Sequence, residues 1–175
     1  MELSSALAAV IPTFESDRLR YRAFREDDFE PLARFFADDV SRFYGGPCDR
    51  VTAWRKFAAY PGHWAIRGFG PWAVERKDTN AFIGLVGPWF PEGWVEREIT
   101  WALMPGHHGH GYATEAAATT LQAAYDILGW TTAISVVVKE NTASAAVAAR
   151  LGATVERQID FRGSVADVWR HQPPA

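Results

Sequence analysis

A glycine-rich loop stands between a predicted strand and a predicted helix, and it limits what this chain can fold into. The loop covers residues 106–114 and reads GHHGHGYAT. Glycines let the backbone turn tightly and approach a ligand closely. The unpaired N–H groups at the start of the following helix, helped by the positive end of the helix dipole, attract an anion. We therefore predict a phosphate or pyrophosphate site here.

The hydrophobic pattern on both sides of the loop supports these two elements. Residues 95–103 alternate apolar and polar side chains, broken only at Arg97, which predicts a half-buried strand with Ile99, Trp101 and Leu103 on one face. From Ala113 onward, apolar residues recur at three- and four-residue steps until Gly129. This spacing predicts a helix with one buried face and a glycine at its C-terminal end.

Three kinds of phosphate loop compete for this segment. A P-loop needs Lys followed by Ser or Thr, but Tyr112 and Ala113 stand in those positions. A dinucleotide fingerprint needs a small residue where Thr114 stands and an acidic residue at the end of the next strand, which is absent, and Pro105 interrupts the entry to the turn. A coenzyme A site is the third interpretation and the one we favour.

The loop also resembles a known motif. Residues 108–116, HGHGYATEA, are similar to the pyrophosphate-binding sequence Q/R-x-x-G-x-G/A of the GNAT N-acetyltransferase superfamily. Further segments stand in the family order: DRLRYR at 17–22, FIGLVG at 82–87, EITW at 98–101, and NTAS at 141–144 with LGA at 151–153. The resemblance covers roughly residues 13–170 and is strongest to the branch that includes the ribosomal-protein N-terminal acetyltransferases.

This resemblance implies an α+β GNAT fold, with a mixed central sheet of about six to seven strands flanked by about four helices. Sequence patterns predict helices near 28–37, 48–59, 113–128 and 141–151. They predict strands near 17–24, 64–67, 71–76, 82–90, 95–103, 153–161 and 165–170. The nearly continuous apolar run at 133–138 predicts one more strand, covered on both faces.

Length and composition fit one globular domain over residues 1–175, with residues 1–12 as a peripheral N-terminal extension, and the resemblance implies that this domain is an acetyltransferase. A formal net charge of −3 argues against nucleic acid as a partner. The apolar segment 3–11 is too short to span a bilayer, and Glu2 disfavours a signal peptide, so we expect no membrane association and a cytoplasmic location. The oligomeric state stays open, with a homodimer among the alternatives.

The chemistry implied by the resemblance is direct transfer of an acetyl group from acetyl-CoA to a primary amine of a small molecule or a peptide N-terminus. An ammonium has no free lone pair at neutral pH, so a base must take a proton. Glu98 stands where the family often places that base. The alternative for Glu98 is a strand carboxylate paired with Arg97 or another arginine.

Ser144 is our candidate for the group that protonates the leaving thiolate, with a plain first-turn serine as the alternative. Asn141 can contact coenzyme A, cap its helix, or do both. Backbone N–H groups near Ala102 and Leu103 can bind the thioester oxygen or the pantetheine. The remaining expected cofactor contacts are Met104, His108, Gly109, His110, Gly111, Tyr112, Ala113 and Thr114.

The sequence departs from the family pattern at three positions. His108 stands where Arg or Gln is usual, and His110 where Lys or Arg is common, so fixed positive charge is missing from the loop and the helix amides must carry more of the binding. Thr100 replaces a frequent Gly in the strand before the loop. That change affects the groove that admits the acceptor.

Other interpretations of these residues are weaker. The cluster contains His107, His108 and His110. Side chains of consecutive residues such as His107 and His108 diverge, and no cysteine or carboxylate stands nearby in the sequence, so we expect no metal. Cys48 has no neighbouring histidine to activate it as a nucleophile. A non-catalytic module that binds or senses acyl-CoA is the main alternative function. The aromatic segment 89–94 predicts an apolar acceptor pocket, although most of the eight tryptophans are expected to pack the core.

Overall fold

The computed structural model describes residues 9–173, and its centre is one eight-stranded sheet with the order β1-β2-β3-β4-β5-β6-β8-β7. Neighbouring strands are antiparallel except β5 and β6, which are parallel. The strands are β1 (Phe14–Glu15), β2 (Leu19–Arg22), β3 (Trp72–Arg76), β4 (Phe82–Trp89), β5 (Glu98–Leu103), β6 (Ala133–Val138), β7 (Thr154–Phe161) and β8 (Ser164–His171).

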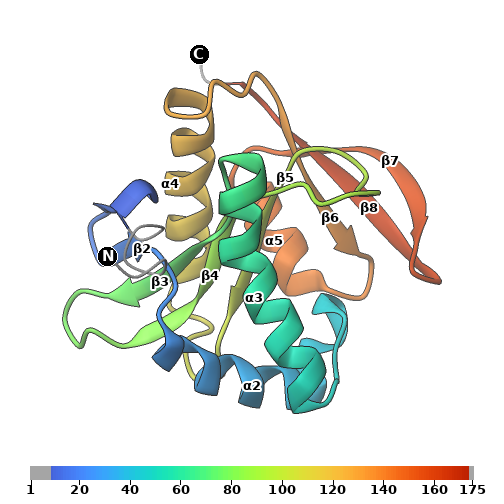
Figure 1. Cartoon of the computed structure of the whole chain (residues 1–175). Helices are drawn as coiled ribbons and strands as arrows, with labels where there is room; N and C mark the ends of the chain where they lie inside the picture. Colours follow the sequence, from blue (N-terminus) through green and yellow to red (C-terminus); the bar gives the residue numbers. More distant parts are fainter. Residues whose placement is uncertain (1–8, 174–175) are drawn as a thin grey trace.

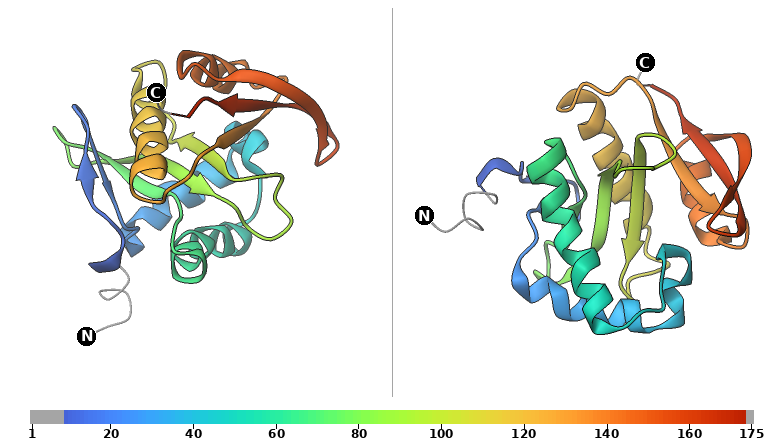
Figure 2. Two further views of the ribbon diagram at one scale, coloured as in Figure 1. Left: turned by 90° about the horizontal axis from the view of Figure 1, so that it is seen from above. Right: turned by 45° about the vertical axis from the view of Figure 1, so that its right-hand side comes forward.

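Helices cover both faces of the sheet (Figures 1 and 2). On one face lie α2 (Phe29–Ala37) and α3 (Arg50–Arg67), which pack against each other. On the other face lie α4 (Tyr112–Asp126) and α5 (Thr142–Arg150). Two 3₁₀ helices, η1 (Glu26–Asp28) and η2 (Asp39–Tyr44), flank α2. The predicted α+β architecture with a mixed sheet flanked by helices is confirmed.

The alternation along β5 separates two cores. Ile99, Trp101 and Leu103 lie in the core under α4 and α5, together with Tyr112 and Leu121. Ala102 and Met104 lie in the aromatic core under α2 and α3. Because side chains alternate across a strand, Glu98 and Thr100 face the α2 and α3 side as well. The predicted face pattern of this strand is therefore confirmed for residues 98–103.

The sheet splits between β5 and β6. Ile134 N donates to the Arg97 carbonyl oxygen over 2.9 Å, and Glu98 pairs with Ile134, but no further residues of these two strands pair. At the next step, Val136 N donates to the Glu98 side chain, and Ser135 Oγ donates to the Ile99 carbonyl oxygen. Side chains thus replace the backbone ladder, and the strands diverge towards their C-terminal ends (Figure 2).

Two predicted boundaries are wrong. Residues 64–67 are not a strand, because α3 runs without a break from Arg50 to Arg67 and contains Pro61 in its interior. The pair Pro61 and Gly62 resembles a helix terminator, yet Trp64 on the next turn is buried and donates to the Pro71 carbonyl oxygen, so tertiary packing outweighs the local signal.

The strand predicted from residue 95 begins at Glu98, after a loop that closes with Trp94 N donating to the Pro91 carbonyl oxygen. Of the predicted N-terminal extension, residues 1–8 lie outside the described residues, whereas Ile11 is buried and Pro12 accepts a hydrogen bond from Trp72 Nε1. Within residues 9–173, no helix has both the length and the apolar character needed to cross a membrane.

Candidate active site

The loop before α4 has the backbone that its glycines predict. Gly106, Gly109 and Gly111 all have left-handed φ angles, of 88°, 80° and 79°. Gly111 is the N-cap of α4, and no side chain caps the first N–H groups of the helix. A Cβ on Gly109 would meet nothing within 4 Å, so space above the loop is open. An anion can therefore reach these N–H groups directly.

Positive charge does reach this loop, from a distant part of the sequence. Arg18, in the turn between β1 and β2, donates through Nη1 to the His110 carbonyl oxygen over 2.9 Å and lies over the Tyr112 ring at 4.7 Å. The guanidinium of Arg76 in β3 also lies over the Tyr112 ring, 5.5 Å from its centroid. Two guanidinium groups therefore adjoin Tyr112 in the first turn of α4, although the loop itself contains no Lys or Arg.

Glu115, in the first turn of α4, fixes Arg18 in place. Its carboxylate accepts from Ser16 Oγ at 2.7 Å, from Arg18 N at 2.8 Å and from Arg18 Nε at 2.6 Å. These hydrogen bonds lower the pKa of Glu115 against the effect of its burial. The acidic residue of the loop motif thus ties α4 to the β1–β2 turn.

The two loop histidines have different environments. His108 Nε2 lies 3.1 Å from the Leu103 carbonyl oxygen, and because a carbonyl oxygen only accepts, Nε2 carries the hydrogen. His110 is exposed, and its ring lies 5.6 Å from that of Tyr112. The neighbouring His107 has a pKa below its ordinary value, mainly through desolvation and then through the charge of Arg76.

A groove with a volume of about 310 Å³ runs from His108 and Ala113 at this loop, past the C-terminal half of β5, to the first turn of α5. Of the residues predicted to contact the cofactor, Leu103, His108, Ala113, Asn141 and Ser144 line it. Phe35, Val40, Arg42, Phe43, Tyr44, Trp101, Ala143 and Val147 complete the lining.

The backbone of β5 offers hydrogen-bonding groups to the groove. Met104 N donates to the Ile83 carbonyl oxygen in β4. Because backbone groups alternate in direction along an antiparallel ladder, the N–H group of Ala102 also points to β4, whereas the N–H groups of Trp101 and Leu103 point to the gap between β5 and β6. Of the two backbone N–H groups predicted to bind the thioester oxygen or the pantetheine, that of Leu103 faces the gap, whereas that of Ala102 faces β4. The N–H group of Trp101 also faces the gap.

A second cavity, of about 290 Å³, lies on the α2 and α3 side of β5 and meets the groove. Phe43, Tyr44, Trp101, Asn141 and Ser144 line both spaces. The predicted aromatic wall is present, since Trp89, Pro91 and Trp94 line the cavity. Thr100 also lines it, opposite Gly87 in β4.

Glu98 lies in this second cavity and is 5% exposed. Its carboxylate accepts from Trp94 Nε1 at 2.5 Å and from Val136 N at 3.2 Å, and it forms no ion pair with an arginine among residues 9–173. Desolvation raises the pKa of Glu98 to about 7, against the opposing effects of these two donors and of Arg162. A carboxyl group with this pKa can take a proton near neutral pH.

Ser144 lies where the two spaces meet. Trp101 Nε1 donates to Ser144 Oγ over 3.2 Å, so the serine hydrogen is free to point at another acceptor. Asn141 is the N-cap of α5, and its Oδ1 accepts from Ser144 N over 3.2 Å. The predicted capping role of Asn141 is confirmed, and its amide N–H₂ stays available to a ligand because the cap uses only the oxygen.

Tyr44, at the end of η2, is a site residue that the sequence did not indicate. Burial raises the pKa of its hydroxyl, while polar contacts with the side chains of Ser144 and Asn141 lower it by less. The hydroxyl therefore stays protonated at neutral pH. Tyr44 belongs to no motif and comes from a short 3₁₀ helix, so only the tertiary structure brings it to Ser144.

Two other candidates stay apart from this site. Cys48 is half-buried in the loop before α3 and does not line either space. In the described part of the chain, no three His, Cys, Asp or Glu side chains gather in a way that could hold a metal ion.

Comparison with known proteins identifies the family. Residues 18–154 match the family model described as an acetyltransferase (GNAT) domain. An uncharacterised N-acetyltransferase of Bacillus subtilis, YoaA, is 29% identical over 151 residues, with 82% of this chain and 83% of that protein covered. An acetyltransferase from Agrobacterium tumefaciens has a solved structure with 33% identity and a TM-score of 0.86, with 93% of this chain and 95% of that one covered.

Structural neighbours include ribosomal-protein acetyltransferases, as the resemblance implied. A ribosomal α-N-protein acetyltransferase solved with coenzyme A has a TM-score of 0.75 and 15% identity, with 93% of this chain and 98% of that one covered, which shows a shared fold. The fold and the matched domain define an acyltransferase enzyme. The chain belongs to the GNAT acetyltransferase family.

Proposed function

We propose that this enzyme transfers an acetyl group from acetyl-CoA to the primary amine of a small molecule or a peptide N-terminus, and that the site described above performs the transfer. One observation carries the proposal. A groove that begins at the α4 N-terminus meets a cavity that holds Glu98, and Ser144 and Tyr44 stand at their junction. A cofactor and an acceptor can thus approach each other from opposite ends.

The chain's residues fit coenzyme A. The N-terminus of α4, the open space at Gly109 and the guanidinium of Arg18 suit a pyrophosphate. The exposed edge of β5 suits the amides of pantetheine, because Trp101 and Leu103 N–H groups face the groove. Coenzyme A supplies the thioester whose carbonyl carbon the amine attacks.

Glu98 acts as the base in this proposal. It accepts the proton that the ammonium loses, directly or through a water molecule, so that the nitrogen lone pair can form the C–N bond. The N–H groups of Trp101 and Leu103 lie along the gap where the thioester oxygen gains negative charge. The C–S bond then breaks and the nitrogen loses its second proton. Ser144 Oγ, which lines the same junction as Tyr44, gives its proton to the thiolate and regains one from that nitrogen through solvent, so that amide and thiol are the products.

The experiment is a measurement of thiol release from acetyl-CoA with a panel of amines, followed by identification of the acetylated product. Turnover with at least one amine, lost in Glu98→Gln, supports the proposal. Coenzyme A binding without thiol release for any amine would instead favour the acyl-CoA-binding module that the sequence left open.

A further inference from the structure

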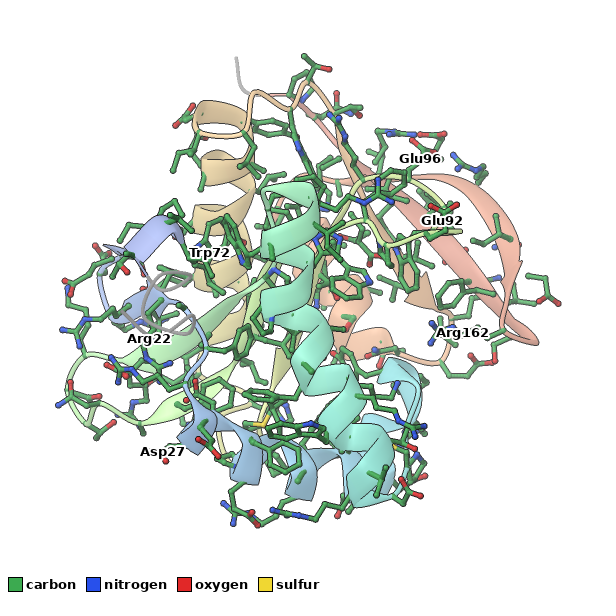
Figure 3. The ribbon with its side chains drawn as sticks, viewed as in Figure 1. Arg22, Asp27, Trp72, Glu92, Glu96 and Arg162 are labelled. Carbon is green, nitrogen blue, oxygen red and sulfur yellow. The ribbon has the colours of Figure 1, made fainter. Side chains whose placement is uncertain are left out.

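Two positive side chains converge on the cavity that holds Glu98. Lys56 comes from α3, and Arg162 comes from the turn between β7 and β8. A Cβ added to Gly45 would lie 3.0 Å from Lys56 Nζ and 3.0 Å from Arg162 Nη1, so the two nitrogens are at most twice that distance apart. Figure 3 shows Arg162 at the end of the β7–β8 hairpin.

Neither side chain has a carboxylate partner in residues 9–173. Their close contacts are aromatic: Lys56 Nζ lies 5.3 Å from the Phe36 ring centroid, and the Arg162 guanidinium lies 5.3 Å from that of Trp94. Desolvation lowers the pKa of Lys56; the neighbouring Cys48 opposes this shift, and the charge of Arg162 adds to it. Lys56 is half-buried and Arg162 is exposed, and both line the cavity without an ion pair to any described residue. Two like charges held together in this way form a favourable position for an anion.

The backbone of Arg162 supports a functional role for its position. Arg162 and Gly163 form a two-residue hairpin turn with φ angles of 57° and 81°. Turns of this kind favour Asn, Asp or Gly at the first position, because a left-handed φ is unfavourable for a long side chain. The Arg162 guanidinium nevertheless lines the cavity. The left-handed φ of Arg162 has a conformational cost, and a position that carries such a cost is a candidate for a functional role.

The rest of the cavity wall is largely aromatic. Phe36, Tyr44, Tyr60, Trp89, Trp94 and Phe161 line it. A ligand that fills this space therefore needs an apolar body as well as a group that complements the two cations.

We propose that the acceptor is an amine that also carries an anionic group, a carboxylate or a phosphonate, on an apolar body. Lys56 and Arg162 bind the anionic group, the aromatic wall packs against the body, and the amine faces Glu98. This assignment rests on the proposed acetyl transfer and names the substrate class of the same site.

Direct binding tests the anion site without turnover. Phenylacetate and uncharged phenylacetamide are titrated, in the presence of coenzyme A, by intrinsic tryptophan fluorescence, because Trp94 adjoins Arg162. We expect phenylacetate to bind at least about tenfold more tightly, the effect of one charge-assisted contact. The double variant Lys56→Met/Arg162→Gln should remove this preference. Equal Kd values, or no binding of either probe, would overturn the proposal.

Arg55→Gln is the matched control, since Arg55 is an exposed α3 arginine next to Lys56 that does not line the cavity. It should keep the preference for phenylacetate. Coenzyme A affinity should stay unchanged in the double variant. A parallel loss of coenzyme A binding would mean that the two cations serve the cofactor, and would overturn the assignment to the acceptor.

Kinetics with phenylalanine and phenethylamine, which differ by a carboxylate, separate this inference from the proposed reaction. We expect a kcat/KM at least about tenfold higher for phenylalanine, and a loss of that advantage in the double variant. If amines without an anionic group are acetylated as well as those that carry one, the result supports the acetyl transfer and contradicts the anion site. If phenylacetate binds through the two cations but no amine releases thiol, the result supports the anion site and contradicts the acetyl transfer.

Discussion

The indole Nε1 of Trp94 donates a hydrogen bond to Oε2 of Glu98 over 2.5 Å. The indole comes from the loop between β4 and β5, and the carboxylate from the first residue of β5. The N–H stabilises the ionised carboxylate, so Trp94 opposes the burial that raises the pKa of Glu98. Trp94 also lines the cavity in which we propose that the acceptor binds, so one side chain contacts that space and lowers the proton affinity of the proposed base.

Substitution of Glu98 tests the base. Because the ionised carboxylate accepts the proton, kcat/KM should rise with pH through about 7, the pKa to which burial raises Glu98. Glu98→Gln should lower the rate at pH 7 by about 100-fold, and the loss should shrink as the pH approaches the pKa of the acceptor amine, which then needs no base. Steady-state rates across the pH range check this. An unchanged profile in the variant would return Glu98 to a structural role.

Trp94→Phe separates the hydrogen bond from the aromatic surface. Loss of the N–H donor should raise the pKa of Glu98 and move the rising limb of the pH profile up by about half to one unit. Trp94→Ala should in addition raise the acceptor KM much more than it changes coenzyme A affinity, since it removes contact area in the acceptor cavity. Trp89→Phe is the control, because Trp89 lines the same cavity without a hydrogen bond to Glu98 in the described structure. A shift of equal size in Trp89→Phe would argue against the specific role of Trp94.

Ser144 and Tyr44 are expected to act as one proton-donating unit. Ser144→Ala should lower kcat at every pH and leave the coenzyme A Kd within about tenfold, because the hydroxyl serves the leaving thiolate more than the bound cofactor. Tyr44→Phe should have a similar effect. The double variant should lose little more than the worse single variant, as residues of one unit are not additive. Fully additive losses in kcat would show that the two hydroxyls act independently.

The fold and the cofactor loop follow from local sequence, for physical reasons visible in particular residues. Three glycines with left-handed φ before an amphipathic helix leave few alternatives to an anion site. The alternation of β5 assigns Trp101 to the core under α4 and α5 and Glu98 to the opposite face, although both side chains line the cavity that holds Glu98. The helical continuation through Pro61 was not predictable in the same way, because the packing of Trp64 is a tertiary interaction.

The polar contacts around the site depend on long-range packing, so the sequence could not show them. Arg18 comes from the turn between β1 and β2, yet its guanidinium hydrogen-bonds to Glu115 and to the His110 carbonyl oxygen, more than 90 residues away in the sequence. Tyr44 and Arg162 come from a 3₁₀ helix and a hairpin turn that contain no recognisable motif. An arginine in a position that favours Asn or Gly is the one local signal that could have drawn attention to the hairpin.

Replacement of Gly111 tests the anion site, with Gly68 as a control. Both glycines have left-handed φ angles, of 79° and 75°, and Gly68 ends α3 away from the groove. Alanine at either position should lower the free energy of unfolding by about 1–2 kcal/mol. Only Gly111→Ala should weaken coenzyme A binding, by about tenfold or more, because its methyl group lies at the N-terminus of α4 where the backbone must approach the ligand. Calorimetry on both variants decides this: equal coenzyme A affinity would place the pyrophosphate elsewhere.

His171 is expected to make the protein sensitive to acid. Ser135 Oγ donates to the Ile99 carbonyl oxygen, so at the 2.8 Å contact between Ser135 and His171 the imidazole Nε2–H must be the donor. This leaves the buried Nδ1 without a partner, and protonation would place a hydrogen and a charge there. Desolvation accordingly lowers the pKa of His171 from 6.5 to about 4.

A histidine whose pKa is depressed in the folded protein binds protons more readily after unfolding. Its contribution to stability is complete above pH 6.5, decreases as the pH falls from 6.5 to about 4, and is constant below that, with a total loss of about 3 kcal/mol. His171→Phe removes the titrating group, and Ser135 can keep its bond to Ile99. The variant should be less stable at pH 7 but lose less free energy of unfolding between pH 6.5 and 4.5. Denaturant unfolding at several pH values measures both slopes, and parallel slopes for variant and wild type would show that His171 is not the group responsible.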